Sequence, residues 1–248
     1  MQKQICLKHI VVLLCGWSWA IIKPVVKIFV YWFAFSIGLR HGKPINGYPY
    51  FLWLIAGIVP WFYMEDMIIG GTKCIRRYSY LVTKMKFPVS TIPTFVSISS
   101  MLVNLLLLSV VVILYAIFGH MPDLYTLQML FYIVLSFIFF TLWALFSSFL
   151  GAMSKDFVNL IRSFLTAVFW LSGIMWNPDT IKIQWLKKLL NINPVTYLVN
   201  GFRNCLINKI WFWEQPKRLL YFGIITFILL LAALWSYKKL RKDIADVL

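Results

Sequence analysis

Acidic side chains are scarce in this chain of 248 residues, which has 8 aspartates and glutamates against 24 lysines and arginines. Only Glu65 and Asp66 fall inside a long apolar run, and as helix neighbours they would point about 100° apart. They therefore do not form the facing carboxylate pair that general acid–base catalysis uses. We expect no catalytic residues and no enzymatic activity in this chain.

Cysteine and histidine are also sparse, with 4 cysteines and 3 histidines. The cysteines form no CxxC pair and the histidines are scattered singly, so neither a disulfide framework nor a metal site is expected. The sequence also lacks the GxxxxGK[ST] loop that cradles nucleotide phosphates. We therefore predict that the chain holds no cofactor of its own and does not hydrolyse ATP by that route.

Long apolar runs dominate the sequence instead. Hydrophobic residues make up 61% and charged residues 13%, where soluble domains average about 45–50% and about 25%. A hydrocarbon core about 30 Å thick needs about 20 helical residues to cross it. The sequence therefore predicts an all-α polytopic membrane protein, a single transmembrane domain over residues 1–248. Its expected parts are an interface segment (1–18) and six spans, at 19–39, 51–69, 92–118, 127–150, 157–176 and 219–237.

The basic residues predict the orientation of these spans. A net charge of +16 would suggest nucleic acid as a partner of a soluble protein, but here the charges cluster between apolar runs and no recognition module accompanies them. With both termini in the cytoplasm, 15 lysines and arginines lie inside and 9 outside, a bias in the usual direction. We therefore place both termini in the cytoplasm.

Residues 72–88 follow two glycines at the end of span two, and apolar residues recur there at helical spacing with basic residues between them. This pattern predicts a short cytoplasmic helix. Its apolar stripe either docks on a partner or rests on lipid headgroups. The residues of this expected contact are Ile75, Arg76, Arg77, Tyr78, Leu81, Val82, Lys84, Met85, Lys86 and Phe87.

Residues 177–218 are too long for a turn and too apolar for a disordered linker. Lysines alternate with apolar residues over 181–190 before a proline breaks the run. The pattern favours two short amphipathic helices that enter the outer leaflet and turn back; the alternative is a pair of helices on the membrane surface. The candidate functional residues here are Trp185, Pro194, Tyr197 and Arg203.

Aromatic residues make up 18% of the sequence. Anchoring at the membrane boundaries explains most of them, but the first two spans carry more than anchoring needs. Flat aromatic faces suit the passage of sugar rings, although packing between helices gives the same pattern. A proline in the middle of span two favours a kink. The candidate conduit or headgroup contacts are Lys23, Lys27, Tyr31, Trp32, Phe33, Pro60, Trp61 and Phe62.

Several of these segments, taken in order, resemble one family. They are Gly16 to Pro24, Tyr31 to Phe33, Gly57 to Phe62, Leu81 to Pro88, Ile92–Pro93, Asn193–Pro194 and Gly201 to Arg203. Together they resemble the permease subunits of ABC-2 type polysaccharide exporters over about residues 16–248. The wall teichoic acid exporter permease is the nearest match, with O-antigen, capsule and rhamnose-polysaccharide permeases as near relatives. The chain departs from the family at its N-terminus, where the family has a longer polar segment.

The resemblance implies a homodimer that encloses a conduit, with two copies of a cytoplasmic ABC ATPase subunit that bind ATP and Mg. It implies that 72–88 is the coupling helix and that 177–218 holds the outer gate helices. The implied activity is export of an undecaprenyl-diphosphate-linked, teichoic acid-like polysaccharide across a bacterial cytoplasmic membrane. Lys23, Lys27, Arg76 and Arg77 are then candidates to receive the diphosphate, or else orientation signals. The alternatives are export of a drug or small lipid, a membrane-embedded glycosyl- or acyltransferase, and a structural scaffold.

Overall fold

The computed structural model describes residues 22–39, 44–84, 88–178 and 183–241. Over these ranges the chain forms helices and one isolated bridge but no strand, as the all-α prediction requires. It divides into two compact units, Met1–Ile55 and Ala56–Leu248, which are described separately.

The first unit contains a helix over residues 22–32 that continues as the π-helix η1 (Phe33–Leu39). A tight turn follows, in which the backbones of Ile45 and Tyr48 exchange two hydrogen bonds of 3.0 Å. Its central residues, Asn46 and Gly47, have φ of 50° and 80°. Asparagine followed by glycine is the pair that tolerates two positive φ angles in succession. Helix α2 (Tyr50–Asp66) begins directly after this turn and crosses the boundary between the units.

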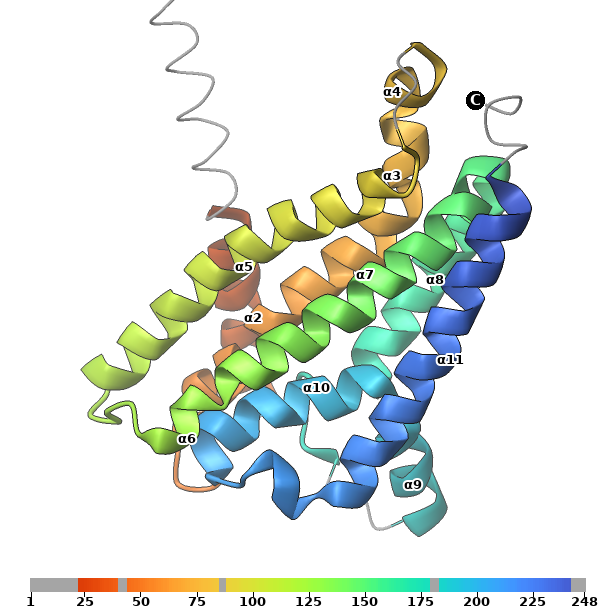
Figure 1. The fold of residues 1–248 in the computed structure, drawn as a ribbon. Helices are drawn as coiled ribbons and strands as arrows, with labels where there is room; N and C mark the ends of the chain where they lie inside the picture. Colours follow the sequence, from red (N-terminus) through yellow and green to blue (C-terminus); the bar gives the residue numbers. More distant parts are fainter. Residues whose placement is uncertain (1–21, 40–43, 85–87, 179–182, 242–248) are drawn as a thin grey trace, which may run out of the picture. The chain divides into compact units, whose positions relative to one another are not determined.

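The second unit holds most of the described chain, and Figure 1 shows its helices. In order after α2 they are η2 (Met67–Gly71), α3 (Thr72–Arg77), α4 (Ser79–Lys84), α5 (Thr91–Ile117), α6 (Leu124–Leu127), α7 (Met129–Met153), α8 (Lys155–Leu171), α9 (Gln184–Ile192), α10 (Pro194–Arg203), η4 (Asn204–Asn208), η5 (Phe212–Glu214) and α11 (Pro216–Leu240).

Four helical segments among the described residues are long and apolar enough to cross a membrane: Tyr50–Lys84, Thr91–Ile117, Leu124–Met153 and Pro216–Leu240. They correspond to four of the six predicted spans. The helix predicted over 157–176 ends earlier, at Leu171, because the chain turns at Gly173 with φ of +65°. With 17 residues, α8 is about 25 Å long, shorter than a hydrocarbon core.

Helix α7 is the centre of the second unit, and α3, α5 and α11 all pack on it (Figure 1). Small residues let the backbones approach closely. A Cβ added at Gly71 would lie 2.7 Å from the Cβ of Ala144, and one added at Gly151 would meet the carbonyl oxygen of Thr72. The hydroxyl of Thr72 donates to Ser147 Oγ at 2.9 Å across the same contact. Small residues and hydroxyl hydrogen bonds are the usual means of joining helices in lipid.

Candidate functional site

The α3–α4 segment, residues 72–84, is anchored on α7 by its first turns. Cys74 and Ile75 are fully buried in a cluster with Phe149 and Ala152 of α7 and Leu240 of α11. Tyr78 and Val82 pack against the same cluster and are partly buried. We predicted Ile75 on an exposed contact face, and the structure places it in the core instead. The reason is that α3 continues directly from η2, which turns this side of the helix toward α7.

Arg76 holds this segment to the end of α7. Its Nη2 donates to the carbonyl oxygen of Ala152 at 2.7 Å. Because α7 ends at Met153, this carbonyl is one of the last four, which lack a partner within their own helix. A cation at a helix C-terminus also interacts favourably with the helix dipole. Arg76 therefore acts on α7 rather than on the outer face of the segment.

The exposed side of the α3–α4 segment consists of other residues. A break at Tyr78, where φ is −108° and ψ is 30°, divides the single helix that we predicted into two. Arg77 just before this break and Tyr80 and Lys84 after it are exposed, and Leu81 is half-buried. Tyr80, with 52% of its surface exposed, was not among the predicted contact residues. The predicted contacts Met85, Lys86 and Phe87 lie outside the described residues.

The predicted conduit residues divide into two groups. In the first unit Lys23, Lys27 and Phe33 are exposed, while Tyr31 and Trp32 are half-buried. The ring of Phe29 lies 6.0 Å from Trp32 and 6.5 Å from Phe33, so the side chains of this helix form an aromatic cluster.

The other group lies on α2. Pro60, Trp61 and Phe62 are buried, and Trp61 is only 2% exposed, with its ring 5.5 Å from Phe169 of α8. Within one copy of the chain these three side chains are therefore buried, and Trp61 packs against a neighbouring helix; their role in a conduit stays a prediction.

Arg203 joins three parts of the second unit. Its guanidinium Nη1 and Nη2 donate to the carbonyl oxygens of Gly173 and Ile174 at 2.7 and 2.6 Å. The side chain is 3% exposed. A Cβ added at Gly57 of α2 would lie 2.5 Å from Nη2, so α2 approaches the guanidinium closely. These two carbonyls of the non-helical backbone after α8 are thus satisfied by protein.

The turn between α9 and α10 is tied to the same place. Asn193 caps α10 by accepting from the backbone of Val195 at 3.0 Å, and its amide donates to Ser172 Oγ at 2.8 Å. Pro194 takes the first helical position, where its missing N–H costs nothing.

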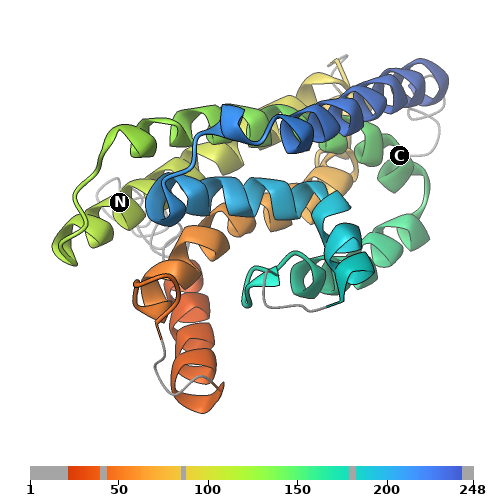
Figure 2. The same ribbon diagram turned by 90° about the horizontal axis from the view of Figure 1, so that it is seen from below.

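The two helices around this turn differ in their surroundings. Helix α10 is largely buried and contacts α7, α9 and α11 (Figure 2), and the ring of Tyr197 lies 5.0 Å from that of Phe222 and is tilted by 32° to it. Trp185 of α9 is 68% exposed. Only α9 therefore has the exposed surface that we considered for a helix lying on the membrane.

Helix α8 carries a polar stripe that we did not single out from the sequence. Asn159, Ser163 and Thr166 are spaced by four and three residues and therefore share one face, and all three are exposed. Asp156 and Arg162 are exposed nearby. The spacing of these polar residues within the predicted fifth span was the signal that could have revealed the stripe.

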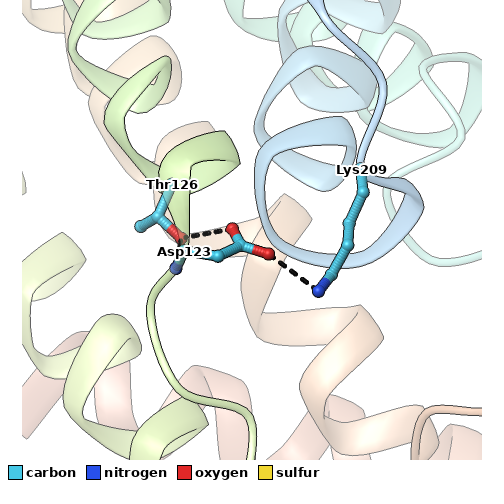
Figure 3. A network of polar contacts seen from close by, with 3 residues as sticks. All are labelled: Asp123, Thr126 and Lys209. Carbon is cyan, nitrogen blue, oxygen red and sulfur yellow. Dashed lines mark hydrogen bonds and ion pairs between the residues drawn. The ribbon is translucent and has the colours of Figure 1, made fainter.

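At the other end of α7 from the α3–α4 segment, two polar contacts hold the chain after η4. Asp123 and Lys209 form an ion pair of 2.7 Å, and Thr126 bonds to the same carboxylate (Figure 3). Partial burial raises the pKa of Asp123, but the bond to Lys209 and its positive charge, together with Thr126, lower it more, so the pKa lies below its usual value. Gln128 donates to the carbonyl of Ile210 at 2.7 Å and accepts from the backbone of Phe212 at 3.0 Å.

Comparison with known proteins defines the class of this membrane protein. The family model of ABC-2 type transporters matches residues 14–207, and the chain therefore belongs to the ABC-2 type transporter family. It is similar to the "O-antigen export system permease protein RfbA" of Myxococcus xanthus, with 21% identity over 93% of this chain and 87% of that protein. A protein of the same description from Klebsiella pneumoniae is 24% identical over 94% of this chain and 87% of its own length.

Proposed function

We propose that this chain is the permease subunit of an ATP-driven exporter that moves a lipid-linked cell-surface polysaccharide out of a bacterial cell. The observation that carries the proposal is the exposed polar stripe of α8, Asn159, Ser163 and Thr166. Ser163 Oγ donates to the carbonyl oxygen of Asn159 at 3.1 Å within the helix. Lipid offers no partner to the side-chain amide of Asn159, so the stripe belongs against water or protein. A second copy of the chain that turns the same stripe inward would enclose a polar conduit, which a hydrated polymer requires.

We assign the energy supply for export to a separate partner protein. The chain belongs to a transporter family and lacks a phosphate-binding loop. We assign the exposed face of the α3–α4 segment, Arg77, Tyr80 and Lys84, to contact with a cytoplasmic ATPase subunit, two copies of which bind ATP and Mg. Because Arg76 and the buried cluster fix this segment to α7, a push on it is transmitted to the centre of the second unit. Nucleotide then biases the permease by its different affinity for two conformations.

We assign the exported molecule to a chemical class, the cell-surface polysaccharides. The relatives that match most of the chain carry O-antigen export in their printed names, and the sequence motifs resemble teichoic acid exporter permeases. We assign the cargo as a polysaccharide carried on undecaprenyl diphosphate. The exposed Lys23 and Lys27 are suited to receive the diphosphate, because charge-assisted hydrogen bonds to phosphate are strong. We place both termini in the cytoplasm, and α9 and α10 as re-entrant helices that form the outer gate.

Export is tested by gene deletion and by substitution of the stripe. Deletion is expected to remove the polymer from the cell surface and to leave lipid-linked polymer inside, and chemical analysis of that polymer identifies it as teichoic acid or neutral polysaccharide. Asn159→Leu/Ser163→Leu/Thr166→Leu is expected to abolish complementation at unchanged membrane abundance. Ser109→Leu is the matched control, because Ser109 is exposed on α5, away from α8. Full export by the triple variant would refute the conduit assignment.

The orientation has its own test. The natural Cys74 is fully buried and unsuited to thiol labelling, so a cysteine at Tyr80 in a cysteine-free background is the better probe. A membrane-impermeant maleimide should label Tyr80→Cys only in inverted vesicles. Labelling from outside intact cells would contradict the proposed topology and the coupling assignment with it.

A further inference from the structure

A rigid aromatic surface lies at the end of α7 that is remote from the α3–α4 segment. The indole rings of Trp211 and Trp213 stack with centroids 4.5 Å apart and planes within 9° of parallel. Trp211 in turn lies 4.8 Å from the ring of Tyr125 at the start of α6. Trp213 is 55% exposed although Trp211 covers one side of its ring and the ring of Phe212 lies 4.7 Å away in an edge-to-face contact.

The backbone that carries these rings is held by several independent polar contacts. Lys209 is paired with Asp123, the Gln128 amide bridges two backbone groups on either side of Trp211, and Glu214 Oε1 accepts from the backbone N–H of Trp211 at 3.3 Å. The ring of Phe212 stacks on Phe131 of α7 at 4.2 Å. The orientation of the exposed Trp213 ring is thus fixed before any ligand arrives, which lowers the entropic cost of binding.

This fixed orientation separates two uses of an exposed tryptophan. A tryptophan that only anchors a protein in the lipid headgroup region is stabilised by its depth in the membrane, and the orientation of its ring plane is not important. A flat ring held in a set plane suits a flat, weakly polar ligand face, such as the C–H face of a pyranose ring. The carboxylate of Glu214, next along the chain, supplies acceptors for hydroxyl groups.

We infer that Trp213, backed by Trp211 and flanked by Glu214, is a binding site for a sugar ring of the exported polysaccharide. The inference rests on the proposed function for the identity of its ligand. Because the site lies beside the α9–α10 segment in sequence and at the opposite end of α7 from the proposed ATPase contact, it would receive the chain as it leaves the conduit.

The test uses the full chain in lipid nanodiscs and four neutral hexasaccharides as probes, made of glucose, mannose, galactose or rhamnose, with binding followed by saturation-transfer NMR. The wild-type chain should bind at least one of them. Trp213→Leu, which keeps an apolar side chain but removes the flat face, should weaken binding about tenfold. Trp213→Phe should stay within about threefold, because it keeps a ring. Trp235→Leu is the control for loss of an exposed tryptophan elsewhere, because Trp235 of α11 is 54% exposed, and it should bind as wild type.

Each outcome decides between the sugar site and a membrane anchor. Failure of the wild type to bind any of the four probes, or equal binding by Trp213→Leu, would overturn the inference and assign Trp213 to the membrane interface. The proposed function fails separately, if the deletion strain still displays its surface polymer. Loss of export on deletion together with probe binding that does not depend on Trp213 would refute the sugar site alone.

Discussion

Arg203 offers the sharpest test of the packing that holds the α9–α10 region. Its guanidinium is buried and donates to two backbone carbonyls, those of Gly173 and Ile174. Arg203→Met keeps a long, flexible side chain of good helix propensity but removes both bonds. The two carbonyls then lose their charged partner in a place that water does not reach.

The size of the effect follows from these contacts. A hydrogen bond to a charged group contributes about 1.5–3 kcal/mol, and a buried carbonyl left without a partner costs about 1–3 kcal/mol. Removing the charge also removes the cost of burying it, which offsets part of the loss. We expect a net destabilisation of about 3 kcal/mol, which for a chain of this size lowers the melting temperature by about 6–12 °C. The melting temperature of Arg203→Lys should lie between those of the wild type and Arg203→Met, because one ammonium group does not reproduce the planar, two-pronged donor geometry of the guanidinium.

The measurement is thermal unfolding of the purified chain in detergent or nanodiscs, followed by loss of the monodisperse peak. Arg162→Met is the matched control, since Arg162 is exposed on α8 and should change stability by less than about 0.5 kcal/mol. If Arg203→Met melts as the wild type does, the guanidinium does not hold the loop after α8, and the reasoning fails.

Three further predictions concern separate contacts. Gly57→Ala should destabilise the chain by about 1–3 kcal/mol by pressing on the clamped Arg203, whereas Gly70→Ala, with open space around it, should be neutral or stabilising in the same melting assay. The triple variant Arg77→Glu/Tyr80→Asp/Lys84→Glu should reach the membrane in the same amount as the wild type but should no longer co-purify with an ATPase subunit. The control variant Lys238→Glu should still co-purify with that subunit. If the triple variant also retains the ATPase subunit, the assignment of this face to ATPase contact is wrong. Since the folded-state pKa of Asp123 is lowered, its pairing with Lys209 stabilises the chain above the unfolded pKa, about 3.9, and this contribution is lost as pH falls through the lower folded value. Asp123→Asn should therefore cost up to about 1 kcal/mol at pH 7 and nothing near pH 2, measured by denaturation at the two pH values; an equal cost at both would contradict the ion-pair account.

The α3–α4 segment shows which features of the fold could be predicted from the sequence and which could not. The alternation of basic and apolar residues predicts a helix after span two, and helices are found there. The stripe of that helix does not reveal whether it faces a partner or the protein itself. The structure decides this: the direct continuation of η2 into α3 places Ile75 against α7, and the break at Tyr78 is followed by an exposed Tyr80. Such a break depends on packing against α7 and α11, which no local pattern records.

The sequence by itself determined the class of this protein. Long apolar runs with few charges have no stable place in water, and their length matches a bilayer, so a helical membrane protein followed from composition and hydrophobic pattern. Ordered motifs pointed to the family to which the chain belongs. Only the tertiary structure decided which helix each face meets. The partners of Arg203 lie about 30 residues before it, Trp61 packs on Phe169 of a distant helix, and the polar side of α8 is left exposed. Hydrophobicity drives a side chain out of water without selecting its neighbour, because that choice depends on shape, close approach at small residues and hydrogen-bond partners far away in the chain.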